Sequence, residues 1–177
     1  MTLHSDVRAV LSGWTAPDDA QAALRDDYVG FLDEHDDAVW RACVPGHITA
    51  SALVISPDRS RVLLTLHPKV GLWLQMGGHL EPGDAGLRAA AAREALEESG
   101  IAGLQVGDAP LRLDRHRVTC HGGSDHLDVQ YVALAPPGAV HVMSEESLDL
   151  AWFDVDALPD LTDDALRNLL AAALRSD

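Results

Sequence analysis

The sequence predicts one domain of the α+β class, in which a mixed β-sheet packs between helices. Its length of 177 residues suits a single domain. Apolar residues make up 47% of the chain, which is enough to bury a core. Segments that read as helix or strand follow one another as helices, hairpin, loop, helix, strands and helix, an order typical of a mixed-sheet sandwich.

The first 44 residues are predicted to form a helical N-terminal extension. Thr15 precedes Asp18 by three residues, and Pro17 lies in the turn that would follow, so Thr15 is expected to cap a helix. Apolar side chains then recur at helical spacing and predict one buried face, made of Leu24, Tyr28, Phe31 and Leu32.

A β-hairpin is expected after this extension. Residues 48–55 and 61–66 are rich in β-branched and aliphatic side chains, and the turn-forming residues SPDRS lie between them. Residues 71–84 contain four glycines and a proline, so they are predicted to be mostly loop.

The second half of the chain is predicted to alternate between helix and strand. Residues 87–99 combine alanines with long side chains and read as a helix, and Gly100 stands where a C-terminal cap belongs. Strands are expected over 111–118, 126–134 and 150–155, and a closing helix over 162–175 with Thr162 or Asp163 as its cap.

Composition and charge exclude several classes of protein. The formal net charge is −15, with 28 acidic against 13 basic residues, so most of the surface would repel duplex nucleic acid. No apolar run approaches the ~20 residues of a membrane span, and the N-terminus lacks the pattern of a signal peptide. Two cysteines, Cys43 and Cys120, cannot form a disulfide framework. We therefore expect a cytoplasmic protein that binds neither nucleic acid nor membranes.

The choice of acidic residue is uneven along the chain. There are 21 Asp and only 7 Glu, and four of these Glu lie between positions 81 and 98, namely Glu81, Glu94, Glu97 and Glu98. Helix propensity favours glutamate, but the other predicted helices use aspartate. The concentration of glutamate in this segment therefore indicates a functional role for these carboxylates.

Three of these glutamates are spaced to share one helix face. Glu94, Glu97 and Glu98 stand at i, i+3 and i+4, which places their carboxylates on one stripe. Such like charges repel, and they lie near the negative end of the helix dipole. A hard divalent cation would remove that penalty, because Mg²⁺ and its relatives prefer carboxylate oxygens. The alternative interpretation is a solvated acidic face without a ligand.

Neighbouring residues fit the metal interpretation. Arg93 lies four residues before Glu97 and could hold one carboxylate in position. Gly77 and Gly78 allow a close approach that side chains would block, so a backbone carbonyl there, that of Gly77, is a candidate metal ligand. Together these residues predict a cluster of divalent cations that is open to an oxyanion such as a diphosphate.

The segment 77–101, GGHLEPGDAGLRAAAAREALEESGI, resembles the signature of the Nudix hydrolases. That signature is G-x5-E-x7-R-E-U-x-E-E-x-G-U, where U is a bulky apolar residue. It covers 24 of the 177 residues. The matching residues are Gly78, Arg93, Glu94, Glu97, Glu98, Gly100 and Ile101.

The segment departs from the signature at a few positions. Asp84 replaces the first glutamate, and eight residues rather than seven separate it from Arg93. Ala95 is small where the family is usually bulky, and Met76 replaces a proline. Asp84 is not predicted to be a metal ligand, because an N-cap role explains it equally well.

The resemblance implies an α/β/α sandwich with the Nudix fold over residues 45–177, and a hydrolase of acid anhydrides that uses Mg²⁺ or Mn²⁺. Its substrates would be nucleoside diphosphates linked to another moiety, such as an NTP or ADP-ribose, with water attacking a phosphorus. Glu94, Glu97 and Glu98 would be metal ligands, and one Glu would act as base. A carboxylate from a later loop often joins them, for which Glu145 and Glu146 are the candidates.

Four residues are candidates for contact with the substrate. Gly78 and His79 follow one another in the signature and would lie near the phosphates. Lys69, the only lysine of the chain, could meet a phosphate, although a surface position is the simpler interpretation. Tyr131 is a candidate for lining the cleft.

A histidine-rich segment after the signature offers another type of ligand. Cys120, His121 and His126 have side chains that transition metals bind, but their spacing matches no standard zinc motif. A hairpin whose histidines border the substrate cleft is the favoured interpretation.

Two other functions stay open at this point. A non-catalytic Nudix module that senses a nucleotide would be free to lose its glutamates, whereas this chain keeps all three. Isopentenyl-diphosphate isomerases of this fold use a cysteine ahead of the helix, whereas Cys120 follows it and Cys43 precedes the sheet. The residues 116–118 carry neither the proline nor the tyrosine that marks two substrate subfamilies. Family members are often dimers, so a homodimer is one expected assembly.

Overall fold

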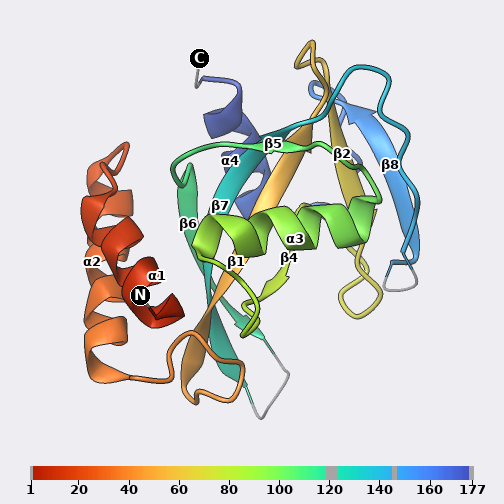
Figure 1. The fold of residues 1–177 in the computed structure, drawn as a ribbon. Helices are drawn as coiled ribbons and strands as arrows, with labels where there is room; N and C mark the ends of the chain where they lie inside the picture. Colours follow the sequence, from red (N-terminus) through yellow and green to blue (C-terminus); the bar gives the residue numbers. More distant parts are fainter. Residues whose placement is uncertain (1, 119–122, 145–146, 176–177) are drawn as a thin grey trace.

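The computed structural model describes residues 2–118, 123–144 and 147–175. Within them the chain forms an α/β/α sandwich with an N-terminal helical extension, which confirms the predicted fold class (Figure 1). The helices are α1 (Leu3–Gly13), α2 (Asp19–Glu34), α3 (Leu87–Ser99) and α4 (Asp164–Ala173). The strands are β1 (Gly46–Ile55), β2 (Arg61–Leu66), β3 (Trp73–Leu74), β4 (Met76–His79), β5 (Gln105–Val106), β6 (Arg112–Val118), β7 (Ser124–Leu134) and β8 (Asp149–Asp154).

The eight strands of the described residues form one mixed sheet with β1 at its centre. β1 pairs antiparallel with β2 and β4, and parallel with β7. The pairing of β1 with β2 confirms the predicted hairpin. All ten residues of β1 are buried, as expected of a central strand that is covered on both faces.

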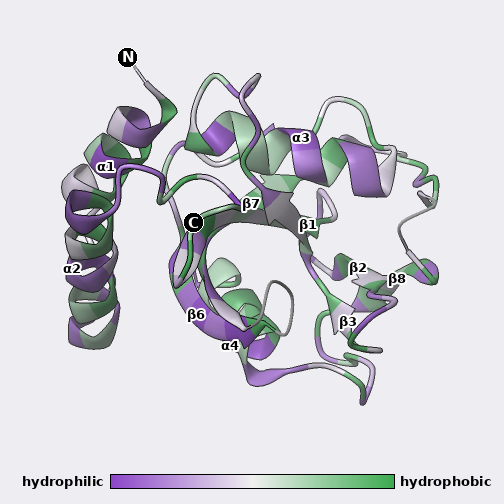
Figure 2. Cartoon of the chain, turned by 90° about the horizontal axis from the view of Figure 1, so that it is seen from below, coloured by the Kyte–Doolittle hydropathy of each residue, from purple (hydrophilic) through white to green (hydrophobic). Residues whose placement is uncertain are grey.

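Helices cover both faces of the curled sheet. Figure 2 shows α3 and α4 on opposite sides of it, with α1 beside α3 and α2 along the edge formed by β6. Side chains of β1 point to both faces of the sheet and so contribute to both apolar clusters. Ile48 and Ala50 join the cluster that contains residues of α1, α2 and α3. Leu53 and Ile55 join the cluster that contains residues of α4. The sheet face therefore decides which helix each residue of β1 contacts.

The N-terminal extension consists of two helices, and their caps differ from the expected one. Thr2 caps α1 by accepting a hydrogen bond from Ser5 N. Asp18 caps α2 by accepting one from Gln21 N. The prediction that Thr15 caps a helix is therefore wrong, because Asp18 itself supplies the oxygen that the first turn needs.

The α2 helix attaches the extension to the outer edge of β6. The Gln21 side chain donates to Leu113 O at 3.1 Å and accepts from Leu113 N at 2.7 Å. Tyr28 Oη donates to Asp114 O at 2.7 Å. Gln21 thereby satisfies backbone groups that a further strand would otherwise pair.

The predicted loop over 71–84 contains two short strands, β3 and β4, that the sequence analysis missed. β4 pairs with β1 at the point where Gly77 lies opposite Ser51. A Cβ on Gly77 would lie 2.4 Å from the Cβ of Ser51, so glycine is required for this approach. The glycines that predicted a loop instead permit close strand packing.

The other predicted elements are confirmed to within two residues at each end. The helix over 87–99 is α3, and Gly100 ends it with a φ of 66°. The closing helix begins later than expected, at Asp164, and Asp163 rather than Thr162 caps it. The short strand β5 was not predicted.

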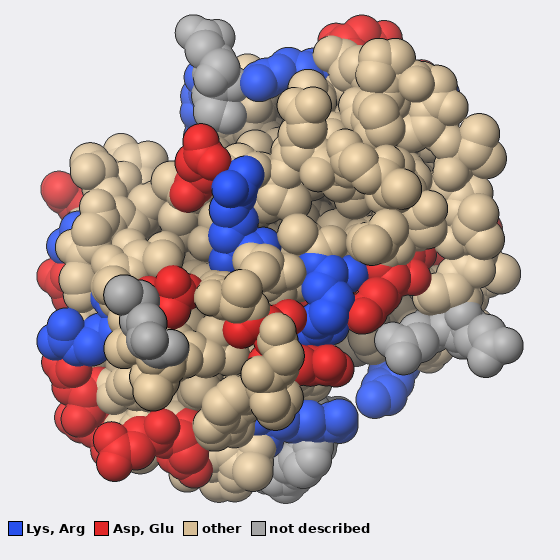
Figure 3. Space-filling view, in the orientation of Figure 1, with Lys and Arg blue, Asp and Glu red and all other residues tan. Residues whose placement is uncertain are grey.

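The surface of the molecule is acidic over the extension. Figure 3 shows acidic side chains gathered over the N-terminal helices, whereas acidic and basic side chains meet over α3. Among the described residues, the helices are all too short or too polar to cross a membrane.

Candidate functional site

The α3 helix presents its carboxylates beside the glycines of β4. Its alanine face packs on the sheet, and Ala91 and Ala95 are fully buried there. This packing leaves Glu94 and Glu98 half-buried and Glu97 exposed. Helical spacing therefore sets which residues share a face, and alanine packing sets how that face is oriented.

The glycine pair lies directly against two of these carboxylates. Gly77 N donates a hydrogen bond to Glu98 Oε1 at 3.1 Å. A Cβ on Gly78 would lie 2.6 Å from Glu94 Oε1, so a side chain there would displace the Glu94 carboxylate. The structure thus brings Gly77, Gly78, Glu94 and Glu98 together, with strand backbone and carboxylates in contact.

Arg93 links the helix to the loop that precedes it. Its guanidinium donates to Glu94 at 2.9 Å and to Glu97 at 3.0 Å. It also binds both oxygens of Asp84, at 2.9 and 3.1 Å, and donates to His79 O at 2.9 Å. The planar fork of arginine is suited to such multiple, bidentate contacts.

Asp84 acts as the partner of Arg93 and does not cap α3. Burial would raise the pKa of Asp84, but hydrogen bonds from Arg93 and from Glu81 N outweigh burial and lower it. The expected N-cap role is wrong, because the α3 N-cap is Gly86, which has no side-chain oxygen. Leu87 N donates instead to Asp6 Oδ2 of α1, at 2.8 Å.

The donor set fits a hard divalent cation. The Arg93 guanidinium pairs with three carboxylates, those of Asp84, Glu94 and Glu97. Glu98 adds a fourth carboxylate beside Gly77, so the site keeps a net negative charge. Carboxylate and carbonyl oxygens are the ligands that Mg²⁺ and Mn²⁺ prefer. The three glutamates and the carbonyl of Gly77 could therefore hold such an ion.

His79 lies among histidines from neighbouring strands. Its ring centroid is 5.0 Å from that of His47 and 5.2 Å from that of His126. Burial, together with the neighbouring imidazoles of His47 and His79, lowers the pKa of His126 to about 3. The His126 imidazole is therefore neutral at neutral pH.

The other predicted site residues lie elsewhere or outside the described residues. Lys69 is exposed between β2 and β3. Tyr131 is buried in the core on the α3 face of the sheet. The structure therefore places Lys69 on the surface and Tyr131 within the apolar packing. Glu145, Glu146, Cys120 and His121 lie outside the residues that the structure describes.

Sequence analysis missed two buried polar residues of the sheet. His47 is 0% exposed, and Asp128 accepts hydrogen bonds from Thr49 Oγ1 at 2.9 Å and Ser51 Oγ at 2.6 Å. Burial raises the pKa of Asp128. The alternation of His47, Thr49 and Ser51 within an apolar strand was the available signal, because residues two apart share a sheet face.

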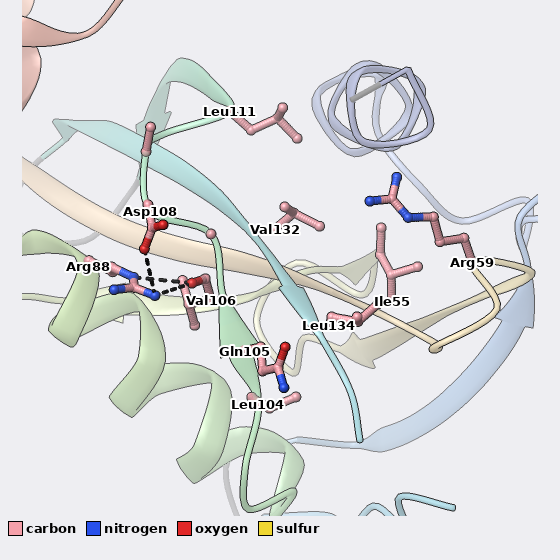
Figure 4. Close-up of a pocket in the computed structure, with 12 residues that line it drawn as sticks. Ile55, Arg59, Arg88, Leu104, Gln105, Val106, Asp108, Leu111, Val132 and Leu134 are labelled. Atoms are coloured by element: carbon pink, nitrogen blue, oxygen red, sulfur yellow. Dashed lines mark hydrogen bonds and ion pairs between the residues drawn. The ribbon is translucent and has the colours of Figure 1, made fainter. Parts of the chain in front are cut away.

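A separate pocket of about 720 Å³ lies beside β5 and β7 (Figure 4). Its charged lining includes Arg59, Arg88 and Asp108. Arg88 is held there by Val106 O and by Asp108. None of the α3 glutamates lines this pocket, so the carboxylate site remains the candidate for chemistry.

Comparisons with known proteins identify the family of this chain. A family model described as NUDIX domain matches residues 45–173, which include α3 and the whole sheet. No curated protein matches the chain significantly.

Several solved structures share the fold. A hydrolase of the NUDIX family from Clostridium perfringens has a TM-score of 0.62 and 22% identity, covering 73% of this chain and 98% of that one. The E. coli dihydroneopterin triphosphate pyrophosphohydrolase has a TM-score of 0.58 and 22% identity, covering 70% and 91%. The NUDIX domain of Shewanella oneidensis NrtR, complexed with ADP-ribose, has a TM-score of 0.57 and 20% identity, covering 82% and 95%.

Proposed function

Because the chain belongs to the Nudix family of hydrolases, we propose that it is a metal-dependent pyrophosphohydrolase. In this proposal it cleaves the diphosphate linkage of a nucleoside diphosphate joined to another group, such as an NTP or ADP-ribose. The supporting observation is the contact of Glu94 and Glu98 with the glycine pair of β4. Two of the similar structures are a triphosphate pyrophosphohydrolase and an ADP-ribose complex, which favours substrates of this class.

Each residue of the site has a role in this proposal. Glu94, Glu97 and Glu98 would hold Mg²⁺ or Mn²⁺, which would supply positive charge to neutralise the diphosphate. One of the three glutamates accepts the proton of the water that attacks phosphorus. Arg93 keeps Glu94 and Glu97 in place, and hydrogen bonding to Asp84 raises its pKa, so its charge is permanent. Gly78 and His79 lie next to these carboxylates and are the proposed substrate contacts.

The test is phosphate release from nucleoside triphosphates, ADP-ribose and dinucleoside polyphosphates with Mg²⁺ or Mn²⁺. Nucleoside triphosphates need added inorganic pyrophosphatase, because a pyrophosphohydrolase releases pyrophosphate from them. ADP-ribose and dinucleoside polyphosphates need an added phosphatase that releases phosphate only from their products. We expect metal-dependent turnover that falls about 100-fold or more in Glu98→Gln, because one carboxylate ligand of the metal ion is lost. Glu34→Gln is the matched control, since Glu34 is exposed at the end of α2.

Two outcomes would contradict the proposal. Unchanged turnover in Glu98→Gln would show that Glu98 is not a metal ligand that the reaction needs. Metal binding without turnover on any substrate would favour the alternative that the chain is a nucleotide-binding module.

We also propose that residues 1–177 form one Nudix domain, with 1–44 as a helical extension. Asp6 of α1 caps α3, and Gln21 of α2 pairs with β6. The same apolar cluster contains residues of the extension and of the sheet. These contacts favour a single cooperative unit.

A further inference from the structure

Three histidines meet on one face of the central strands. His47 of β1 lies opposite His126 of β7 in the parallel register. His79 of β4 lies opposite Thr49, which is two residues after His47 on the same strand. Paired residues and residues two apart point to the same side of a sheet. The imidazoles therefore converge from three strands that are distant in the sequence.

The three imidazoles form a compact triangle. Ring centroids lie 5.0 Å apart for His47 and His79, 4.8 Å for His47 and His126, and 5.2 Å for His79 and His126. One nitrogen from each ring lies within 4.8 Å of the other two. Two nitrogens that each lie about 2.1 Å from one Zn²⁺ can be at most about 4.2 Å apart. Small side-chain rotations would therefore bring all three into the coordination sphere of one ion.

The three imidazoles are largely removed from solvent. His47 is fully buried, and His79 and His126 are half-buried. Nε2 of His126 is buried and has no hydrogen-bond partner among the described residues. A buried polar atom without a partner is costly, and a metal ion would satisfy it.

We propose that His47, His79 and His126 form a second metal site, which binds one borderline divalent cation such as Zn²⁺ through three imidazole nitrogens. Nitrogen ligands favour Zn²⁺ and its neighbours over Mg²⁺ and Mn²⁺, whereas the oxygen ligands of α3 have the opposite preference. Three protein ligands leave one position of a tetrahedral ion for water or for an oxygen of a bound molecule. The new set shares only His126 with the sequence-based group of Cys120, His121 and His126.

The two metal sites are neighbours but are built from different residues. His79 follows Gly78 directly on β4, and Arg93 donates to the His79 carbonyl oxygen. The imidazole site uses no carboxylate of α3 and no residue outside the described ranges. Its occupancy can therefore be tested independently of the proposed hydrolysis.

The test is calorimetric titration of the metal-free full chain with Zn²⁺ in the presence of excess Mg²⁺, which occupies the carboxylates. We expect one Zn²⁺ per chain, and a loss of affinity of roughly 10-fold or more in His126→Gln and in His47→Gln. His141→Gln is the matched control, because His141 lies outside the cluster. Co²⁺ should give visible absorption bands in the wild type that the two cluster variants lack.

Folding and site identity are checked separately. Circular dichroism reports whether each variant is folded, and the half-buried His126 is the safer substitution if His47→Gln fails to fold. Glu98→Gln should bind Zn²⁺ like the wild type even when turnover is lost. The proposal is overturned if the wild type binds no Zn²⁺ in excess Mg²⁺, if folded His126→Gln binds it equally well, or if Glu98→Gln loses it.

Discussion

At the scale of single residues, Arg93 determines how Glu94 and Glu97 of α3 are held. It contacts Glu94 and Glu97 on its own helix and both oxygens of Asp84 in the preceding loop. Asp84 makes this ion pair despite its shorter side chain and the additional residue before Arg93. The residue that departs from the family signature therefore makes a buried contact, since the Asp84 side chain is 4% exposed.

Gly78→Ala should lower turnover while leaving the chain folded. The added Cβ would lie 2.6–2.7 Å from the carboxylate atoms of Glu94, so that flexible side chain must move away from β4. We expect turnover and Mn²⁺ affinity to fall by roughly 10-fold or more, as when the support of a metal ligand is lost. Activity assays and Mn²⁺ titration followed by electron paramagnetic resonance would measure both.

The matched control is Gly30→Ala in α2, where an added Cβ meets nothing within 4 Å. That change should leave turnover unaltered and stabilise the helix by about 0.5–1 kcal/mol. Full activity in Gly78→Ala would show that the position of Glu94 against the strand is unimportant.

The ion pair of Asp84 predicts an acid-dependent stability. Its pKa is lowered in the folded chain, so its contribution is complete above the ordinary value of 3.8 and is lost as the pH falls through the folded pKa. Urea unfolding of the wild type and Asp84→Asn should therefore differ most near neutral pH. The difference should shrink below about pH 4. A difference that is the same at every pH would contradict this account.

At the scale of elements, the extension completes the start of α3. The N-cap of α3 is Gly86, which supplies no side-chain hydrogen bond, and Asp6 of α1 accepts the hydrogen bond of Leu87 N. A Cβ on Gly86 would lie 2.6 Å from Asp6 Oδ2, so glycine permits this contact. A carboxylate at this end also interacts favourably with the helix dipole. The cap is therefore supplied by a residue 81 positions away.

Asp6→Ala should destabilise the protein by about 1 kcal/mol, the usual cost of losing an N-cap. It should also lower turnover, because the first turn of α3 loosens. Asp27→Ala, at an exposed position of α2, is the control and should not destabilise the chain. Denaturant unfolding measures both effects. Equal stability of Asp6→Ala and the wild type would mean that water replaces the cap without loss.

At the scale of the whole molecule, one core joins the extension to the sheet. Val7 and Leu11 of α1 and Tyr28 of α2 are all 0% exposed and belong to the cluster that contains residues of β1 and α3. The NUDIX family model begins at residue 45, beyond both helices. The apolar core therefore includes residues on both sides of residue 45, where the family match begins.

The full chain should unfold in one transition. Trp14 and Trp40 lie on the extension side and Trp73 and Trp152 on the sheet side, so variants that keep one pair report each part. We expect the fluorescence of both pairs and circular dichroism to give the same denaturant midpoint, as two-state unfolding requires. An earlier midpoint for Trp14 and Trp40 alone would show that the extension is a separate unit.

The sequence by itself determined the elements that depend on residues close together in the chain. The periodicity of α3, its C-terminal glycine and the spacing of Glu94, Glu97 and Glu98 involve contiguous residues, so they could be predicted together with the signature. The hairpin of β1 and β2 follows from two apolar runs and a turn in the same way. The carboxylate face of α3 is therefore a consequence of local spacing alone.

Only the tertiary structure decided which distant residues meet. The pairing of β4 with β1, the ion pair of Asp84 with Arg93 and the cap from Asp6 depend on packing that leaves no local pattern. The three histidines come together because β1 pairs with both β4 and β7. Strand register between segments far apart in the sequence is set by burial and side-chain fit, and a single sequence does not reveal it.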